Sequence, residues 1–448
     1  MTTSAGAGFR PLLCADLELS NPSQPHGVPV GAGLHLTVRL HSEPLGGLLV
    51  EPDRVPAGPD AWREDACGMF GDEIAEHVRA DEIECADDLV TACRAPISAC
   101  ARRLDIVGPA PSAIVVVCTL GQHPMLPASI RALLAQDYVG DFSVVVVDNA
   151  PSSGAAARVV AEIADTRLLL LPAHRVGLSF ARNAALWSAL AADVDLIAYT
   201  DDDAIVDLGW LRSTAATFSE DLGVTSVTGL VLPGSLLSEA EQLFEEGSGF
   251  TKGYKRTVWS TATTDSSVWR LGPQGDGGGL FPFSAGLFGS GNSMAFRTEA
   301  LRALGGFDEA LGAGTPAGGG EDLDMFLRVI ASGGTIVYEP RAMVRHFHRQ
   351  SVDALSQQMS AYGSGLSAYL FREFLHLRGA KLRLLRVVPR GIRRMFSLNS
   401  EKNQSRTNEY PRELVRAERR GFVAGPWLYL KSRRRVRKLA RTADIQAP

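Results

Sequence analysis

The sequence predicts an α/β fold with a mainly parallel central sheet, a small amino-terminal α+β module and a basic, helical carboxyl-terminal tail. Between residues 112 and 203, short apolar runs alternate with segments of helical periodicity. Polar or acidic residues follow directly after three of these runs, and long Gly-rich stretches come later in the chain. Strands that alternate with helices form βαβ units, whose right-handed crossovers build a parallel sheet.

The elements of the predicted sheet can be placed one by one. Each apolar run is short and bounded by polar residues, which favours a buried strand. Strands are expected at residues 114–117, 142–147, 167–171 and 194–199, and helices at 126–135, 155–164 and 179–191. The Gly-rich stretches at residues 272–279 and 312–320 are typical of binding or lid segments.

The composition is that of a folded protein, since 448 residues with 45% hydrophobic content support real cores and exclude extensive disorder. No apolar run approaches the roughly eighteen residues of a membrane-spanning helix. The first ten residues lack the apolar core of a secretion signal. All six cysteines lie in the first 118 residues without a C-x-x-C pair. We therefore expect buried thiols in preference to disulfides, no zinc motif, and a cytosolic protein.

Three regions differ in their sequence pattern: an accessory module at residues 1–105, a central domain at 106–350 and a carboxyl-terminal extension at 351–448. In the module, residues 34–40 alternate as a strand should, and Pro44–Gly47 predicts the turn before a second strand. Residues 61–102 interleave acidic and apolar positions and are expected to be helical. Nothing in this module indicates chemistry.

Positive charge is concentrated in the extension. From Arg372 onward there are 21 Lys and Arg against 6 Asp and Glu, a net charge of +15. Because the whole chain has a net charge of −5, the part before Arg372 has a net charge of −20. The densest cluster, Lys431–Lys438, follows the aromatic segment Phe422–Tyr429. Basic clusters beside aromatic residues suit an anionic membrane surface or nucleic acid. No nucleic-acid-binding motif is present, so we expect no nucleic acid partner; the alternative to membrane contact is a solvated helical face.

Three consecutive acids, Asp201, Asp202 and Asp203, follow the apolar run that ends at Tyr199. Ligands of open α/β sheets bind beyond the carboxyl ends of such strands. Three carboxylates there repel one another unless a cation lies among them, and Mn²⁺ or Mg²⁺ prefers oxygen ligands and is often shared with phosphates. The alternative is a solvated turn whose acids cap the next helix.

Two other predicted strand ends, at Thr119 and at Asp148-Asn149, fall on the same edge of the sheet as the acid triplet. A nucleotide could lie across this edge, with Asp148 accepting hydrogen bonds from a base N–H; an ordinary turn is the alternative. A glycine, Gly177, leads into the helix that carries Arg182 and Asn183. Arginine suits phosphate oxygens and helix starts attract anions, although a surface arginine on a polar helix face would give the same pattern.

Together these residues resemble the inverting family-two glycosyltransferases, which have a nucleotide-sugar-binding α/β fold of the GT-A type. The amino-terminal module looks similar to those preceding some actinobacterial members. The resemblance covers roughly residues 112–350 and rests on motifs in a fixed order. These are Thr119, Asp148-Asn149, Gly177 to Arg182-Asn183, Asp201-x-Asp203, Gly289 to Asn292, Gly305 to Glu309, Gly320 to Asp324, and His346-Phe-His348.

The resemblance implies roles for these residues. Asp148 would contact the nucleobase, Asp201 the ribose or the metal shell, and Asp203 would hold a divalent cation that bridges the diphosphate. Asp322, with Glu321 beside it, would form the catalytic motif, with Asp322 as the general base toward the acceptor hydroxyl. The remaining implied contacts with substrate are those of Thr119, Arg182, Asn183, Gly291 and Asn292.

The histidine pair and the acids before residue 330 also have structural explanations. His346 and His348 would point to one face of a strand, and the resemblance implies that one of them helps to bind the metal or the diphosphate. Their alternative is a partly exposed pair at a strand end. Glu321 and Asp322 also have the marks of a helix start, and Asp324 is expected to be structural.

The predicted activity is inverting transfer of a sugar from a nucleotide-diphosphate donor to an acceptor hydroxyl, with a glycan, lipid-linked or small-molecule acceptor. The Q-x-x-R-W motif and the transmembrane helices of processive synthases are absent from the sequence, which predicts a non-processive enzyme. A nucleotidyltransferase is less favoured because residues 118–124 contain no lysine or arginine for a phosphate loop. A catalytically silent sugar-nucleotide scaffold is the third alternative.

Overall fold

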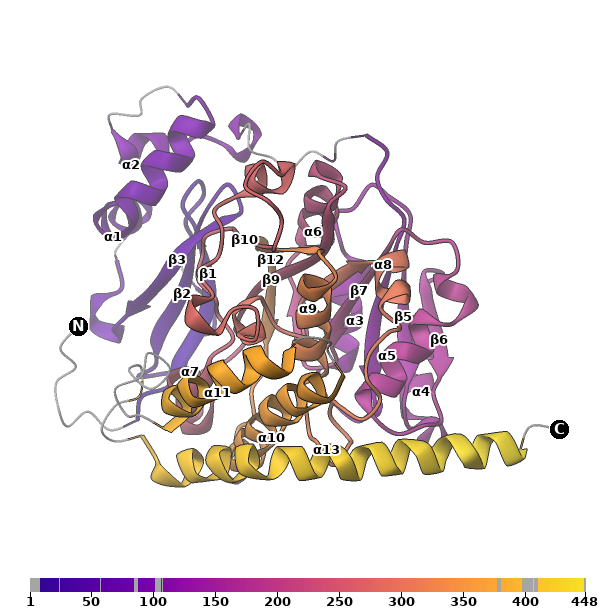
Figure 1. Ribbon diagram of the computed structural model, residues 1–448. Helices are drawn as coiled ribbons and strands as arrows, with labels where there is room; N and C mark the ends of the chain where they lie inside the picture. Colours follow the sequence, from indigo (N-terminus) through magenta and orange to yellow (C-terminus); the bar gives the residue numbers. More distant parts are fainter. Residues whose placement is uncertain are drawn as a thin grey trace.

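The computed structural model describes residues 9–446 except 24, 57, 84–87, 101–105, 107, 377–379, 397–405 and 407–409. Cys85, one of the cysteines expected to be a thiol, and several residues of the predicted tail lie outside this description. The remaining chain forms a large mixed sheet with helices on both faces, an amino-terminal module at one side and long carboxyl-terminal helices across the base (Figure 1).

The central sheet follows the order β10-β12-β9-β11-β7-β4-β5-β6, and β8 pairs with β12. Its strands are β4 (Ala113–Thr119), β5 (Phe142–Asp148), β6 (Leu168–Pro172), β7 (Leu196–Asp201), β8 (Ala204–Val206), β9 (Val224–Pro233), β10 (Thr257–Trp259), β11 (Met294–Arg297) and β12 (Thr335–His346). The neighbours β7, β4, β5 and β6 are parallel, as are β9 and β12. Antiparallel pairing is confined to the contacts of the short strands β8, β10 and β11. The α/β class with a mainly parallel sheet is therefore confirmed.

Successive residues of the central strands are buried on opposite faces of the sheet. Val115 and Val117 pack with α3, α4 and α6, whereas Val116 packs with α5, α9 and α10. Burial of both faces explains why these strands are continuous apolar runs. The helices of this domain are α3 (Leu126–Leu134), α4 (Ala155–Ile163), α5 (Leu178–Leu186), α6 (Trp210–Glu220), α7 (Glu239–Ser248), α8 (Thr298–Ala303) and α9 (Glu321–Ala331).

The amino-terminal module has its own core. It contains β1 (Leu12–Glu18), β2 (Gly33–Leu40), β3 (Glu43–Val50), α1 (Pro59–Ala80) and α2 (Leu89–Ala92). The hairpin turns at His41-Ser42, so the turn predicted at Pro44–Gly47 is wrong: those residues belong to β3 and pair with β2. Arg39 reaches Asp207 of the central domain at 2.8 Å, which docks the module against the sheet.

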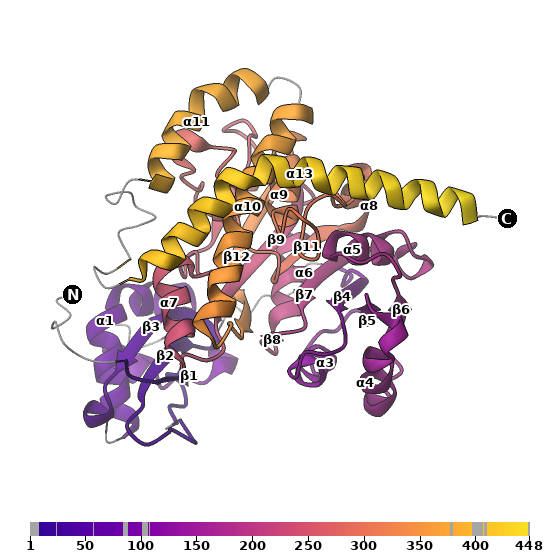
Figure 2. The same ribbon diagram turned by 90° about the horizontal axis from the view of Figure 1, so that it is seen from below.

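Three helices follow the sheet: α10 (Val352–His376), α11 (Ala380–Phe396) and α13 (Arg412–Gln446). The helices α10 and α13 lie side by side beneath the sheet (Figure 2). A Cβ atom on Gly363 would lie 2.0 Å from the carbonyl oxygen of Glu418, and one on Gly421 equally close to that of Ser360. The two backbones therefore touch because glycine lines the crossing. Within the part of the chain that the structure describes, no helix is long and apolar enough to cross a membrane.

Candidate functional site

The three consecutive acids at the end of β7 separate into different environments. Asp202 accepts a hydrogen bond from the hydroxyl of Thr119, at the end of the neighbouring strand β4. Asp203 is buried and leads into β8, which pairs with β12. The alternative of acids that cap the next helix is wrong, because a strand follows Asp203 and the next helix, α6, begins at Trp210.

One cluster at this edge offers ligand atoms for a cation. Asp201, Asp203 and His346 each contribute an atom, and these atoms lie within 4.8 Å of one another. The Nε2 atom of His346 is 3.2 Å from Oδ1 of Asp203. Burial raises the pKa of Asp201 to about 6, with Arg182 opposing the shift and the neighbouring Asp203 adding to it. Two carboxylates and an imidazole suit Mn²⁺ or Mg²⁺, and these three residues are placed to hold such an ion.

The two histidines at the end of β12 have different surroundings. His346 is the last residue of the strand, whereas His348 lies beyond it. The Nδ1 atoms of the two rings are 3.1 Å apart, and Nε2 of His348 is 2.7 Å from the carboxylate of Glu245. Among the described residues, the cluster of ligand atoms around Asp203 includes His346 and not His348. His348 thus links His346 to α7, in the position of a residue that orients a metal ligand.

Arg182 lies buried between the acids of β7 and those of α9. Its side chain is only 3% exposed, and its guanidinium lies 2.9 Å from the carboxylate of Glu321 and 3.6 Å from that of Asp201. It also donates to the carbonyl of Gly291 at 3.1 Å. Burial excludes the alternative of a surface arginine, whereas the phosphate contact stays a prediction. The arginine balances negative charge beneath the site.

Two asparagines hold loops, and neither presents its side chain to open space. Asn183 bonds both the N–H and the carbonyl of Phe307, so it fixes the loop that follows α8. Asn149, the second residue of the Asp148-Asn149 motif, also holds a loop. Its side chain accepts from the N–H of Gly177 and donates to the carbonyls of Ala173 and Arg175. The side chain of Asn183 thus positions the loop after α8, and the substrate contact expected of it stays a prediction.

The end of β5 lies beside the end of β4, as the strand pairing of Asp148 with Thr119 shows. Asp148 is buried, and its Oδ1 accepts from the N–H of Ala150 at 2.9 Å. Thr119 is also buried and receives the N–H of Gly121 while it donates to Asp202. The parallel register therefore brings the three predicted strand ends to one edge.

The start of α9 presents two neighbouring carboxylates with different exposure. Glu321 is buried against Arg182, and burial together with the nearby charge of Asp322 raises the pKa of Glu321 to about 7 against the opposing effect of Arg182. Asp322 is half-buried, and its Oδ2 accepts from the N–H of Gly291 at 3.0 Å. A Cβ atom on Gly291 would lie 3.1 Å from that same oxygen. Asp322 is therefore the accessible acid of the pair, and Gly291 fixes its orientation.

The residue after Gly291 has unused hydrogen-bonding capacity. Asn292 is 2% exposed, and both polar atoms of its side-chain amide lack a partner within the described residues. Its backbone carbonyl accepts from the hydroxyl of Thr200 in β7, so the residue lies directly beside the strand that carries the acids. A buried amide without a partner costs free energy unless a ligand or water satisfies it.

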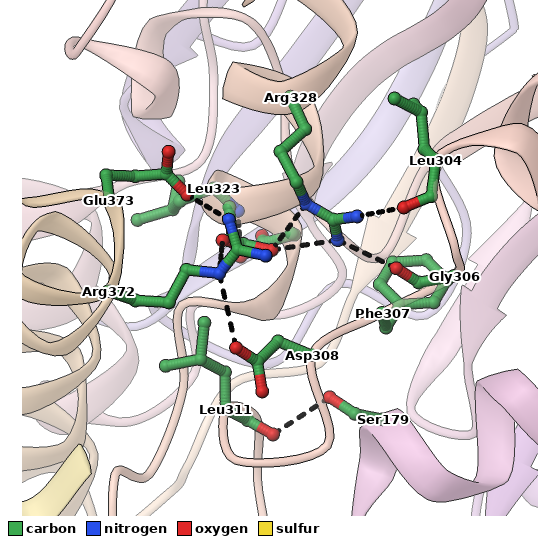
Figure 3. Close-up of polar contacts among 12 residues, drawn as sticks. Ser179, Leu304, Gly306, Phe307, Asp308, Leu311, Leu323, Arg328, Arg372 and Glu373 are labelled. Atoms are coloured by element: carbon green, nitrogen blue, oxygen red, sulfur yellow. Dashed lines mark hydrogen bonds and ion pairs between the residues drawn. The ribbon is translucent and has the colours of Figure 1, made fainter. Parts of the chain in front are cut away.

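A charged network lies behind α9 and joins it to α10 (Figure 3). Arg328 and Arg372 both contact the buried Asp324, at 2.8 and 3.1 Å. Arg372 also contacts Asp308 and Glu373. Arg328 donates in addition to the carbonyls of Leu304 and Gly306. The expectation that Asp324 is structural agrees with these contacts, which fix the helix whose first turn carries Asp322.

The part of the chain that carries this site matches two known protein families. Residues 114–272 match the family model described as glycosyl transferase family 2, and residues 196–400 match the one described as glycosyl transferase family group 2. This part of the chain is a family 2 glycosyltransferase domain. Every acid and histidine of the site lies within residues 114–400.

Relatives of the domain are distant. Pre-mycofactocin glycosyltransferases from two strains of Mycobacterium tuberculosis are 28% identical over 202 residues, or 44% of this chain; the match spans 36% of the length of those relatives. A mannosyltransferase from Pyrobaculum calidifontis, solved with GDP-Man and Mn²⁺, aligns with 17% identity and a TM-score of 0.39 over 87% of this chain and 88% of its own. GalNAc-T7, solved with UDP, GalNAc and Mn²⁺, aligns with 15% identity and the same score over 62% of this chain and 54% of its own.

The glycosyltransferase domain has two site neighbours that the sequence did not suggest. Burial lowers the pKa of the Lys252 ammonium, and the charges of Asp322 and Glu245 oppose this shift. Burial raises the pKa of Tyr362 in α10, and the charges of Asp322, Asp203 and Asp201 add to the shift. Neither residue belongs to a motif. Both are brought to the site by segments whose position depends on tertiary packing.

The network behind α9 predicts an unusual response to pH in the glycosyltransferase domain. Burial and the adjacent Asp324 raise the pKa of Glu373 to about 8, against the opposing effect of Arg372. One carboxylate oxygen of Glu373 is buried without a hydrogen-bond partner, and a proton shared with Asp324 would satisfy it. The pKa of Glu373 in the folded protein exceeds its usual value of 4.5, so protonation of Glu373 stabilises the folded state. This stabilisation is complete below pH 4.5 and is lost as the pH rises through 8.

We therefore expect Glu373→Gln, which resembles the protonated carboxyl, to stabilise the protein at pH 8 by roughly 2–4 kcal/mol relative to wild type and to have little effect at pH 5. Urea unfolding of both proteins at the two pH values measures the difference. Equal destabilisation at both pH values would show that Glu373 is ionised in the folded protein. Gln357→Glu, at an exposed position of α10, controls for a general effect of changing charge on this helix.

Proposed function

We propose that this protein transfers a sugar from a nucleotide-diphosphate donor to an acceptor hydroxyl, with inversion at the anomeric carbon. The observation that carries the proposal is a division of roles among the acids. Asp201 and Asp203 lie with His346, whereas Asp322 lies on another element and is oriented by Gly291. The charges of Asp201, Asp203 and Asp322 all act on the hydroxyl of Tyr362, so the two groups of acids share one site.

Asp322 is the proposed general base. Its half-buried carboxylate keeps one oxygen on the N–H of Gly291, which holds the side chain in one orientation. A base so placed accepts the proton of the acceptor hydroxyl as the oxygen attacks the anomeric carbon, and the bond to the diphosphate breaks on the opposite face. A single displacement of this kind inverts the anomeric centre.

The residues at the strand ends are proposed to bind the donor. Asp148 and Thr119 lie where a nucleoside would cross the edge of the sheet, and the unpartnered amide of Asn292 provides both a donor and an acceptor. A divalent cation held by Asp201, Asp203 and His346 would neutralise charge on the departing diphosphate. Arg182 beneath the acids limits their mutual repulsion before the donor arrives.

Thermal unfolding with a panel of nucleotide-diphosphate sugars and Mn²⁺ tests this proposal. The cognate donor should raise the stability of the full chain by about 2.7 kcal/mol at a hundredfold excess over Kd. Asn292→Ala should reduce the shift, whereas the control Asn21→Ala, at an exposed position of the amino-terminal module, should not. Slow hydrolysis of the bound donor separates an enzyme from a silent scaffold, which would bind the same nucleotide without turning it over.

We also propose that the acceptor is lipid-linked or part of a cell-envelope glycan, that transfer is non-processive, and that α13 contacts an anionic membrane. The outer face of α13 carries a stripe at helical spacing: Val423, Trp427, Lys431, Arg434 and Lys438 are all exposed. Trp427 is 62% exposed, and the guanidinium of Arg434 lies over its ring. An apolar end next to a basic end suits the interface of a membrane.

Flotation of the protein with anionic and with zwitterionic vesicles measures this contact. Removal of the whole segment would also destroy packing, because Gly425 and Tyr429 are buried against neighbouring elements. We therefore expect the combination Trp427→Ala, Lys431→Gln, Arg434→Gln and Lys438→Gln to abolish binding to anionic vesicles. A matched variant that neutralises the exposed Arg54, Arg131 and Arg158 should bind as wild type does. Equal flotation of both variants would contradict the proposal.

A further inference from the structure

Four side chains of the amino-terminal module converge on one point. They are His41 in the β2–β3 turn, His77 and Asp81 at the end of α1, and Cys100 in the segment that leads toward the central sheet. One ligand atom from each lies within 4.8 Å of the others. Both histidines and Asp81 are buried, and Cys100 is half-buried. None of these four side chains belongs to the site described above.

The hydrogen bonds of His41 determine which of its nitrogens carries a lone pair. Its Nε2 atom is 2.9 Å from the carbonyl oxygen of Ala95. A carbonyl only accepts, so Nε2 carries the hydrogen and the neutral ring presents a lone pair at Nδ1. That Nδ1 atom faces Nε2 of His77 at 2.9 Å and a carboxylate oxygen of Asp81 at 3.4 Å. Acceptor atoms therefore accumulate at the centre of the cluster.

His77 has the matching arrangement. Its Nδ1 atom is buried and makes no hydrogen bond of good geometry, and it lies 3.3 Å from a carboxylate oxygen of Glu43. A hydrogen on Nδ1 would face this carboxylate and leave the lone pair of Nε2 directed at Asp81, 2.9 Å away. Histidines that bind metals usually direct their second nitrogen at a carbonyl or a carboxylate, and both histidines here do so.

We propose that His41, His77, Asp81 and Cys100 bind one Zn²⁺ ion. Two imidazoles, a carboxylate and a thiolate are ligands that zinc accepts, and four protein ligands are typical of a structural site. The ion would join the hairpin turn, the end of α1 and the segment before the central sheet. No zinc motif is recognisable in the sequence because the four ligands are separated by 36, 4 and 19 positions and include only one cysteine.

The surroundings of the cluster support an ion in preference to a simple hydrogen-bonded group. His41 and Ser42 both have positive φ, at 52° and 72°, a turn conformation that favours Asn-Gly. Glu18 accepts the backbone N–H of each residue and keeps the turn in place. A cavity of about 380 Å³ between the module and the central domain reaches His41 and Cys100. Its lining contains five acids against three arginines, so a cation can approach the site through it.

Metal analysis of the purified full-length protein tests the proposal. We expect roughly one zinc ion per chain that survives dialysis, and replacement by Co²⁺ should give the absorption of tetrahedral cobalt with a thiolate-to-metal band. Cys100→Ser should remove the thiolate band, and His77→Gln should lower the zinc content severalfold. Cys67→Ser, a thiol of the same module outside the cluster, and Asp203→Asn, in the other cluster, should both keep the ion.

Two results would overturn the proposal. One is wild-type protein that neither contains zinc nor takes up Co²⁺ with a thiolate band. The other is a thiolate band that persists in Cys100→Ser and disappears in Cys67→Ser, which would place the ion elsewhere. The cobalt spectrum of the wild-type protein decides the question even if a ligand variant fails to fold.

Discussion

Replacement of Asp322 by asparagine is expected to lower the rate of sugar transfer by about 10²–10⁴-fold while donor binding is retained. Asparagine has the same size, and its carbonyl oxygen can still accept the N–H of Gly291 that orients the native carboxylate. The variant loses the ability to accept a proton, so the chemical step alone should be affected. Transfer at saturating donor and acceptor, together with the donor Kd from calorimetry, separates these two effects.

Asp353→Asn is the matched control for this prediction. Asp353 is also an acid in the first turn of a helix, α10, but it is exposed. Its replacement should leave the transfer rate unchanged. Transfer by Asp322→Asn at close to the wild-type rate would mean that another group accepts the proton. Weaker donor binding with an unchanged rate would assign Asp322 to the donor site instead.

The second large effect is expected at the cluster of Asp201, Asp203 and His346. Asp203→Asn should abolish binding of Mn²⁺ at this position and lower transfer by about 10²–10³-fold, since stabilisation by a cation contributes several kcal/mol and each 1.36 kcal/mol is a tenfold change. The variant removes the charge that lies 3.2 Å from His346. Loss of the free-ion electron paramagnetic resonance signal of Mn²⁺ measures binding independently of activity.

Asp202→Asn is the adjacent control, because the side chain of Asp202 bonds to Thr119 and does not belong to the ligand cluster. It should keep the Mn²⁺ affinity of the wild type, with at most a modest loss of transfer. Chelation of the ion from wild-type protein should reproduce the effect of Asp203→Asn. Full activity after chelation would exclude a role for the cation in transfer.

The strands that carry the site could be predicted from sequence because their information is local. The four expected strands coincide within two residues with β4, β5, β6 and β7. Each is an apolar run buried on both faces, and consecutive parallel strands place their carboxyl ends at one edge. The meeting of Thr119, Asp148 and the acid triplet therefore followed from the pattern alone.

The remaining parts depend on distant partners. The role of Arg182 could not be predicted, because its burial results from α9, more than a hundred residues later in the chain, whose Glu321 neutralises it. The period-two pattern placed His346 and His348 together, and their Nδ1 atoms are 3.1 Å apart. That only His346 joins the ligand cluster could not be predicted, because the partner of His348 is Glu245, about a hundred residues earlier in the chain. The cluster of His41, His77, Asp81 and Cys100 was missed for the same reason, since its members come from three separate segments of the chain.

The contact between Tyr429 and Asp308 sets an order of events during synthesis. The hydroxyl of this tyrosine donates to the same carboxylate oxygen that receives Arg372, in the network behind α9. After the ribosome has added the residues of α9, it must still add about a hundred more before Tyr429 is part of the chain and can contact this carboxylate. The network behind α9 can therefore gain this hydrogen bond only after the first half of α13 has been made.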